Sequence, residues 1–385
     1  MVAVVVFVVV IVASIMIHEA GHFATARWFG MKAERFFFGF GPTLWSVRRG
    51  ETEYGVKAIP AGGFVKIAGM NRYEQIAEGD RPRAFFSKPA WQRAIVLAAG
   101  SVTHYVIAAV LLFVAMAAFP LPRLENGQLA MTNEIVEIEP GSPAEQAGLR
   151  TGDRIVAVDG TPTDDFTAVR NAVGPRAQQL TRLDVQRDGQ TRTVEVQLGV
   201  SDDNGQRRGF LGVYPEMYQR WSPGEALAGV WVGEYSLPTQ VTRSMAGIVQ
   251  IFRPDSIAAW LQQADSDMPR TADGPVSLIG AGQAAAALSN IGQFSSVIVL
   301  LAQLQIVIGT LNLLPLPPFD GGHLAVLGVE SVVNAVRRRR GATNEWQIDP
   351  ASLMPLTLAV LLLFGLFALT ALYIDTVNPI SNLIQ

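Results

Sequence analysis

Four stretches of the chain are almost entirely apolar, and each is long enough to cross a lipid bilayer. They lie at about residues 2–29, 94–119, 294–316 and 354–374, and roughly 20 apolar residues span the hydrocarbon core. The first and third stretches are interrupted near one end by polar residues, and the second carries His104 near its middle. The pattern predicts a polytopic α-helical membrane protein with about four transmembrane helices in a lipid bilayer.

The loop at residues 51–69, between the first two stretches, has a different periodicity. Glu53–Ile59 and Gly63–Ile67 alternate apolar and polar residues on either side of Pro60-Ala61-Gly62. Such alternation around a Pro/Gly turn is typical of a β-hairpin. We expect a membrane-associated hairpin close to the polar end of the first span, where it serves either as a ledge for substrate or only as a cap.

A folded α+β unit is predicted between the second and third stretches, at residues 121–220. Residues 133–160 contain a strand, a short helix, a Gly-Asp turn and another strand. Residues 183–186, 193–198 and 209–213 supply further strands. This region resembles a PDZ domain, a fold that binds extended peptides by adding them to its own sheet. Because no clear carboxylate-cradling loop precedes the first strand, peptide binding and a purely steric gate both remain open.

Residues 221–293 follow this unit and are expected to form an amphipathic and gating segment. From Glu225 to Val249, Ala, Leu, Val and Trp recur at helical spacing with Glu and Arg between them. This spacing predicts an amphipathic helix, which lies on the outer membrane face or packs on the PDZ unit.

Composition narrows the class of protein. The chain has 385 residues, is 49% hydrophobic and only 16% charged, and its formal net charge is −3. These values indicate a membrane protein and argue against a basic surface for nucleic acid. Because the sequence contains no cysteine, disulfides and thiolate zinc sites are excluded.

The distribution of charge predicts the orientation. Residues 27–93 hold twelve Lys or Arg against six Asp or Glu, residues 121–220 hold eleven Arg against fifteen acids, and Arg337–Arg340 is an all-arginine run. The positive-inside rule therefore places the first loop, with its hairpin, and the arginine run in the cytoplasm. Residues 121–293 and both termini are then outside. We interpret the first span as retained, because no basic residue precedes it and His-Glu-Ala-Gly-His follows in place of a cleavage site.

The polar end of the first span carries candidate metal chemistry. His18 and His22 are four residues apart, so on a helix both can reach one metal ion. Glu19 is next to His18, where it can take a proton from a metal-held water. The alternatives are a chance match and a polar cluster that lines a helix interface. Charged groups within a span are costly, and this favours the metal site.

A zinc site needs a third protein ligand and an open position. The third span ends in Asn-Leu-Leu-Pro-Leu-Pro-Pro-Phe-Asp-Gly-Gly-His, residues 312–323. Prolines break the helix there, and the glycines let the backbone turn closely, which directs Asp320 toward the membrane interior. The predicted topology brings this segment to the same leaflet as His18 and His22.

These motifs, together with the PDZ unit, resemble the bacterial site-2 protease family of intramembrane zinc metalloproteases. The resemblance covers nearly the whole chain, including Gly274–Gly280 before the third span. It implies one Zn²⁺ per chain, with His18, His22 and Asp320 as ligands and Glu19 as the catalytic base. It also implies that Asn312 polarises the scissile carbonyl or holds the substrate strand.

The second span departs from the family pattern. Members commonly carry Gly-Pro-x-x-Asn, whereas this chain has Gly100-Ser101-Val102-Thr103-His104. His104 either replaces the asparagine as a hydrogen-bond donor near the site or bonds to a neighbouring helix, and we favour the structural role. His323 is expected to cap the turn or to lie in a second shell around the metal.

The implied activity is peptide hydrolysis within or near the transmembrane segments of single-span proteins. A substrate helix must be partly unwound before attack, and the hairpin could accept the unwound strand. The substrate-binding candidates are Val56, Ile59, Gly62, Gly63, Phe64 and Val65. The resemblance further implies anti-sigma factors and remnant signal peptides as targets, an upstream site-1-type protease, a PDZ filter and a bacterial inner-membrane location.

The expected organisation is a first membrane half at 1–120, a PDZ domain at 121–220, an amphipathic and gating segment at 221–293, and a second membrane half at 294–385. A metal-ion transporter and a non-catalytic PDZ membrane scaffold are the alternatives from other classes. A transporter predicts several sites along a path, and a scaffold gives no reason for Glu19 to lie between two histidines.

Overall fold

The computed structural model describes residues 2–70, 74–203, 206–265, 270, 274–344 and 346–380. The chain forms two compact units. The first, here called the membrane unit, comprises Met1–Ala115 and Gly224–Gln385, and the second, the β-rich unit, comprises Met116–Pro223. Residues 381–385 of the expected second membrane half lie outside the described part.

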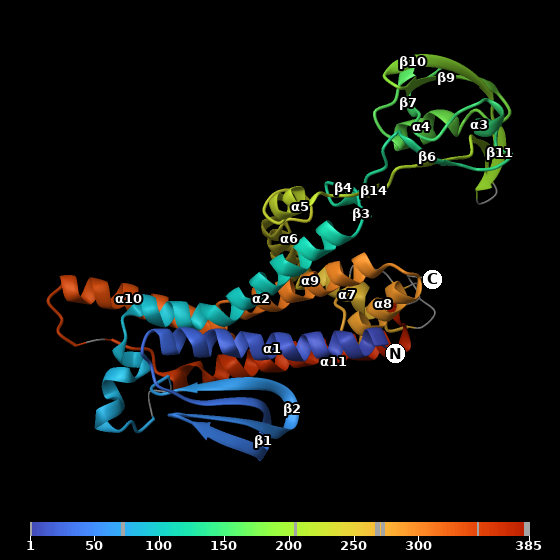
Figure 1. The fold of residues 1–385 in the computed structure, drawn as a ribbon. Helices are drawn as coiled ribbons and strands as arrows, with labels where there is room; N and C mark the ends of the chain where they lie inside the picture. The colour runs from blue at the N-terminus through green and yellow to red at the C-terminus, as the bar shows by residue number, and fades with distance from the viewer. Residues whose placement is uncertain are drawn as a thin grey trace. The chain divides into compact units, whose positions relative to one another are not determined.

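Four helices confirm the predicted spans (Figure 1). They are α1 (Val2–Trp28), α2 (Ala90–Ala118), α9 (Phe294–Asn312) and α11 (Met354–Val377). Each contains a stretch long and apolar enough to cross a membrane. Leucines such as Leu362 on α11 are exposed, as is expected of side chains that lipid covers. The chain is therefore a polytopic membrane protein.

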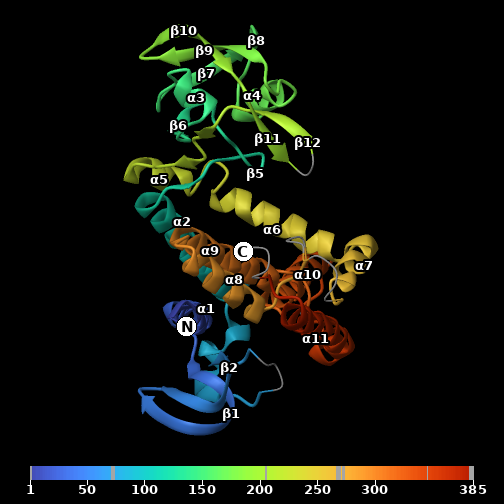
Figure 2. The same ribbon diagram turned by 90° about the vertical axis from the view of Figure 1, so that its right-hand side faces the viewer.

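A short helix, α8 (Leu278–Asn290), packs among the spans (Figure 2). Its small residues Ala281 and Ala285 share a core with Phe7 of α1 and Leu301 of α9. A buried carboxylate holds its N-terminus, because Asp375 of α11 accepts hydrogen bonds from the backbone N–H of Ser277 and from Arg270, both at 2.7 Å. This contact anchors α8 to α11.

The prediction of one amphipathic helix over 225–249 is wrong. The segment forms α5 (Pro223–Gly229) and α6 (Leu237–Ile251), and α7 (Pro254–Gln262) follows. Gly233 between α5 and α6 has φ 101°, a left-handed conformation that a continuous α-helix cannot contain. Ser236 then caps α6 by accepting from the backbone N–H of Thr239. α6 packs against α9, within the membrane unit.

The β-structure after α1 also differs from the predicted hairpin. It consists of β1 (Ala33–Arg49) and β2 (Thr52–Ile67), and the tight turn lies at Gly50-Glu51 instead of at residues 60–62. Phe36 is paired with Tyr54 on one side and Val65 on the other. The two predicted strands are therefore separated by the first half of β1, which the sequence analysis missed.

The pairing of β1 with β2 makes a curled sheet that lies against α1 (Figure 1). Phe23 of α1 makes edge-on ring contacts with Phe36 and Tyr54. Residues 33–38 pair with residues 63–67 on one side, and no described strand pairs with the opposite side of residues 63–67, which is therefore an edge of this sheet. This edge is the part of the sheet that bears on the site.

The third span ends earlier than predicted, at Asn312 instead of Leu316. Three prolines within residues 315–318 lack the N–H donors that would continue the helix. After residues 313–319 the chain starts α10 (Asp320–Arg339), which the sequence analysis did not expect. The arginine run closes α10, where its positive charge suits the C-terminal end of the helix dipole.

The β-rich unit is built on a four-stranded sheet. Its order is β10 (Gln190–Gln197), β9 (Leu180–Arg187), β7 (Arg154–Val158) and β8 (Thr161–Pro162). The remaining elements are β3 (Leu121–Pro122), β4 (Leu124–Glu125), β5 (Gln128–Leu129), β6 (Ile135–Ile138), α3 (Pro143–Gln146), α4 (Phe166–Val173), β11 (Gly199–Asp203), β12 (Gln206–Phe210), β13 (Val213–Pro215) and β14 (Tyr218–Gln219). Helix α4 was not predicted from the sequence, although Asp165 caps it.

The core of the β-rich unit joins sheet, strand and helix. Ile155, Leu183 and Val196 from the sheet pack with Ile135 of β6 and Val169 of α4, all almost fully buried. In β9 the buried side chains alternate along the strand, so Leu183 and Val185 point to the same side.

Candidate active site

The first span delivers three functional side chains from one helical turn. His18, Glu19 and His22 lie on α1, and the side chains of both histidines are almost completely buried. The spacing of four residues puts the two imidazoles on one face, with their ring centroids 4.8 Å apart. This much follows from local sequence alone.

Asp320, which is far from His18 and His22 in the sequence, supplies a third possible ligand atom, a carboxylate oxygen. Its Oδ2 lies 3.4 Å from the Nε2 of His18 and 3.4 Å from the Nε2 of His22. The two Nε2 atoms are 3.2 Å apart. Among the described residues, His18, His22 and Asp320 form a group that could hold a metal ion.

The triangle of donor atoms fits zinc. Four ligands placed tetrahedrally at about 2.0–2.1 Å from Zn²⁺ are about 3.3–3.4 Å from one another, and the observed edges are 3.2, 3.4 and 3.4 Å. The Oδ2 of Asp320 is buried and accepts no hydrogen bond from the described residues. Three lone pairs therefore face one point, and the donor set is the nitrogen and oxygen set that zinc prefers.

Glycine makes room for this triangle on α2. An ideal Cβ at Gly100 would lie 2.4 Å from the Nε2 of His22 and 2.6 Å from the Nε2 of His18. Gly21 allows the same close approach from α1, because a Cβ there would lie 2.9 Å from the carbonyl oxygen of Ala99. The Nδ1 of His22 lies 2.7 Å from the carbonyl oxygen of Val96, which orients that ring. The sequence pattern alone does not indicate this role for Gly100.

Two further glycines place Asp320. A Cβ at Gly321 would lie 2.2 Å from the carbonyl oxygen of Leu313, and one at Gly322 would lie 2.5 Å from the backbone nitrogen of Pro317. The first turn of α10 can therefore fold back onto the end of α9 only if both positions lack a side chain. That packing turns Asp320 toward α1.

Glu19 lies between the histidines and the edge of β2. A Cβ at Gly63 would lie 3.2 Å from the Cγ of Glu19, so the backbone of β2 packs closely against this side chain. The sheet edge and the acid are thus in direct contact. A carboxylate held beside two histidines and a free strand edge can accept a proton from water and pass it on.

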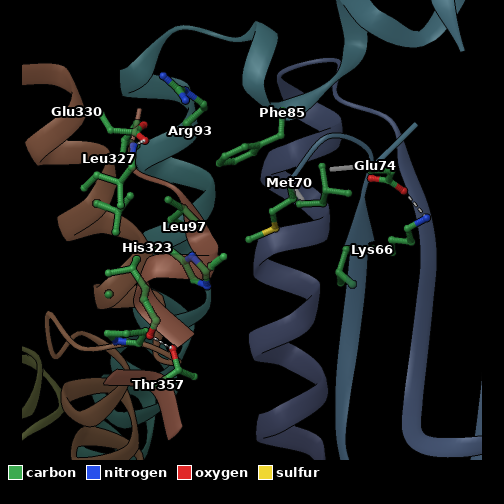
Figure 3. A pocket seen from close by; sticks show the side chains of 18 of the residues that line it. Lys66, Met70, Glu74, Phe85, Arg93, Leu97, His323, Leu327, Glu330 and Thr357 are labelled. Carbon is green, nitrogen blue, oxygen red and sulfur yellow. Dashed lines mark hydrogen bonds and ion pairs between the residues drawn. The ribbon is translucent and has the colours of Figure 1, made fainter. Parts of the chain in front are cut away.

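A cavity of about 960 Å³ adjoins this edge (Figure 3). Phe64 and Val65 of β2 line one side, and Leu97 of α2 and Leu327 of α10 line the other. Lys66, which is ion-paired with Glu74, borders the cavity on the side of the sheet. The wall is mostly apolar, as is typical of a cavity that receives apolar side chains.

The predicted substrate-binding residues separate into two groups. Gly63, Phe64 and Val65 lie beside Glu19 or line the cavity, and Gly62 directly precedes them. Val56 and Ile59 do not line the cavity and are 37% and 54% exposed. The structure does not bring these two side chains to the site, because they belong to a different part of the curled sheet from the edge.

The remaining predicted residues are Asn312, His323 and His104. Asn312 is the half-buried last residue of α9. His323 stands in the first turn of α10 and lines the cavity. His104 is buried on α2, with its ring centroid 5.1 Å from that of His18. Its Nδ1 lies 2.7 Å from the Oε1 of Gln305 on α9, the neighbouring-helix bond favoured from the sequence.

Comparison with known proteins identifies the family. The model of peptidase family M50 matches residues 6–356 of the chain. The chain belongs to peptidase family M50. It is 35% identical to the zinc metalloprotease Rip1 of Mycolicibacterium smegmatis, over 99% of this chain and 98% of that relative. It is 34% identical to the zinc metalloprotease Rip1 of Mycobacterium tuberculosis, over 98% of each chain, and 30% identical to a putative zinc metalloprotease of Brucella suis, over 85% of each.

The family membership confirms the resemblance to site-2 proteases. The protein is an intramembrane zinc metalloprotease, and Zn²⁺ is its cofactor. The metal transporter and the non-catalytic scaffold are accordingly not supported.

Proposed function

We propose that His18, His22 and Asp320 hold the catalytic zinc of this M50 peptidase and that Glu19 is its general base. The observation that carries the proposal is the triangle of donor atoms with edges of 3.2, 3.4 and 3.4 Å, beside which Glu19 lies. Three protein ligands leave a fourth position open, as in catalytic zinc sites generally.

The mechanism assigns a task to each side chain. Zinc, when bound, polarises the scissile carbonyl and lowers the pKa of water toward about 7. Glu19 removes the proton of the attacking water and then delivers it to the leaving amine. The backbone of Gly63, which lies close to the Cγ of Glu19, keeps this side chain in position for both transfers. Asn312 binds the substrate strand or its scissile carbonyl.

The substrate is an unwound segment of a single-span membrane protein, bound as an added strand on the edge of β2. A transmembrane helix hides its carbonyls in its own hydrogen bonds, so it must extend before attack. The edge at residues 63–67 offers backbone groups for such pairing, and Glu19 lies directly beside it. Side chains of the added strand then enter the apolar cavity lined by Phe64, Leu97 and Leu327.

We further propose the cellular arrangement from the charge pattern. The sheet and the site lie toward the cytoplasmic leaflet of a bacterial inner membrane, and the β-rich unit and both termini lie outside. The β-rich unit acts as a PDZ domain that filters substrates after an upstream site-1-type protease has trimmed them. Anti-sigma factors and remnant signal peptides are the substrate class, as the family resemblance implies.

The central test combines metal analysis with cleavage of a model transmembrane substrate. Wild type should contain one zinc per chain and cleave the substrate, and Glu19→Gln should retain zinc while its rate falls by about 10²-fold or more. Cleavage at the wild-type rate by Glu19→Gln would exclude Glu19 as the base. Removal of the β-rich unit should allow cleavage of untrimmed substrates, and unchanged selectivity would exclude the filter.

A further inference from the structure

A chain of buried polar side chains crosses three spans next to the site. The Oγ of Ser14 on α1 donates to the carbonyl oxygen of Val10 at 2.7 Å. The Nε2 of Gln305 on α9 donates to the Oγ of Ser14 at 2.8 Å, and the Oε1 of Gln305 lies 2.7 Å from the Nδ1 of His104 on α2. Ser14, Gln305 and His104 are each 2% exposed or less.

The direction of this chain determines the tautomer of His104. A serine hydroxyl has one proton, and Ser14 gives it to Val10, so Ser14 can only accept from the amide NH₂ of Gln305. The amide oxygen of Gln305 must then accept from His104. Nδ1 of His104 therefore carries the proton, and a neutral His104 has a bare lone pair on Nε2.

Within the described part of the chain, the ring of His18 lacks a hydrogen-bonded acceptor for a proton on its Nδ1. Its Nε2 faces His22 and Asp320, and its Nδ1 is buried without a hydrogen-bond partner among the described residues. A histidine that binds a metal through Nε2 has its proton on Nδ1 and almost always donates it to an acceptor. His22 has such an acceptor in the carbonyl oxygen of Val96, at 2.7 Å. Among the described residues, no acceptor is hydrogen-bonded to the Nδ1 of His18.

His104 is the ring that lies against His18. Gly100 faces the His18–His22 pair from α2, and His104 is four residues farther along the same face. The two ring centroids are 5.1 Å apart and the planes are tilted by 44°. This separation is about twice the distance from an imidazole centroid to its ring nitrogen, plus an N–H···N distance of about 2.9 Å. The separation therefore fits a hydrogen bond between the two rings once the Nδ1 of His18 and the Nε2 of His104 point at each other.

We infer that His104 is a positioning residue that accepts a hydrogen bond at Nε2 from the Nδ1–H of His18, with its tautomer set by Gln305 and Ser14. Every donor in the resulting series, His18 to His104 to Gln305 to Ser14 to Val10, then has one acceptor. The role of the series is to orient the His18 ring and raise its affinity for zinc. The inference rests on the proposed role of His18 as a ligand.

The test measures zinc affinity by competition with a chelator, on the full-length protein in detergent. Loss of the acceptor in His104→Phe, or of its anchor in Gln305→Met or Ser14→Ala, should weaken zinc binding about tenfold to a hundredfold. His104→Gln, which keeps an acceptor at the position of Nε2, should recover most of the affinity. The two anchor variants keep His104 in place, so they test the inference even if His104→Phe does not fold.

A matched control separates this role from helix packing. Tyr105 also joins α2 to α9, through a 3.1 Å hydrogen bond between its OH and the Oγ1 of Thr310, but this pair is not part of the series. Tyr105→Phe should therefore leave zinc affinity unchanged. Affinities of His104→Phe and the anchor variants equal to that of Tyr105→Phe would overturn the inference.

NMR of isotope-labelled histidine gives a second readout. The chain has four histidines, so single substitutions assign each ring, and His104 should show a protonated Nδ1 and a bare Nε2. A protonated Nε2 on neutral His104 would overturn the inference. Wild-type zinc affinity in His18→Ala would instead refute the ligand set and with it the proposed function.

Discussion

Substituting Gly100 by alanine should weaken zinc binding at least tenfold while leaving the fold intact. The new Cβ would lie 2.4 Å from the Nε2 of His22, and 2.5 and 2.6 Å from the Cε1 and Nε2 of His18. Non-bonded carbon contacts are most favourable at about 3.5–4.0 Å, so the rings must retreat by about 1 Å. Metal–ligand distances tolerate only about 0.2 Å. We expect the Kd for zinc to rise at least tenfold, the lower end for loss of ligand orientation.

The stability of the same variant should change little. Overpacking costs about 1–3 kcal/mol, but alanine is favoured over glycine within a helix by about 0.5–1 kcal/mol, which offsets part of it. Gly328→Ala on α10 is the matched control, because nothing lies within 4 Å of its added methyl group. Chelator competition measures zinc affinity, and thermal unfolding measures stability. A Gly100→Ala protein with wild-type zinc affinity would refute the argument that α2 backs directly onto the donor triangle.

Two further substitutions probe the sheet edge and the β-rich unit. Gly63→Ala places a methyl group 3.2 Å from the Cγ of Glu19, so the cleavage rate should fall about tenfold while zinc affinity is kept. The control Gly79→Ala, whose added Cβ has open space around it, should cleave at the wild-type rate. Equal cleavage rates for the two variants would exclude the contact between Gly63 and Glu19. Burial raises the pKa of Asp153, but hydrogen bonds from Arg187 and a backbone N–H outweigh it and hold that pKa below its usual value. The stabilisation this gives is present above the unfolded pKa of about 3.9 and is lost as pH falls through the lower folded value. Urea-dependent proteolysis of the β-rich unit in the full-length chain should show that wild type loses this stabilisation as pH falls and that Asp153→Asn does not. Identical pH profiles for the two proteins would count against this role of Asp153.

Much of the membrane unit could be predicted because its signals are local. A run of about 20 apolar residues is a span whatever surrounds it, and the spacing of His18 and His22 puts both rings on one helical face. The broken end of the third span was predictable from its prolines, although the helix ends four residues before the predicted boundary, at Asn312. Asp320 was expected near the two histidines from topology and family resemblance, and the 3.4 Å distances place it there.

The sheet was predicted less well because strand pairing is not local. Residues 53–59 and 63–67 have the alternation of paired strands, yet each pairs with the first half of β1, which lies between them. Alternation specifies which face of a strand is apolar, but it does not specify the neighbouring strand. Likewise, the helical spacing of residues 225–249 did not reveal that Gly233 and Ser236 divide the segment into two helices.

The sequence by itself therefore determined the spans, the paired histidines with Glu19, and the presence of a separate β-rich unit, since periodicity and charge act over a few residues. Only the tertiary structure decided which surfaces meet. It set Gly100 against the histidine rings, brought the edge of β2 to Glu19, and joined Ser14, Gln305 and His104 across three helices. These contacts depend on the close packing of segments far apart in the chain, and no local pattern encodes the partner of a buried polar side chain.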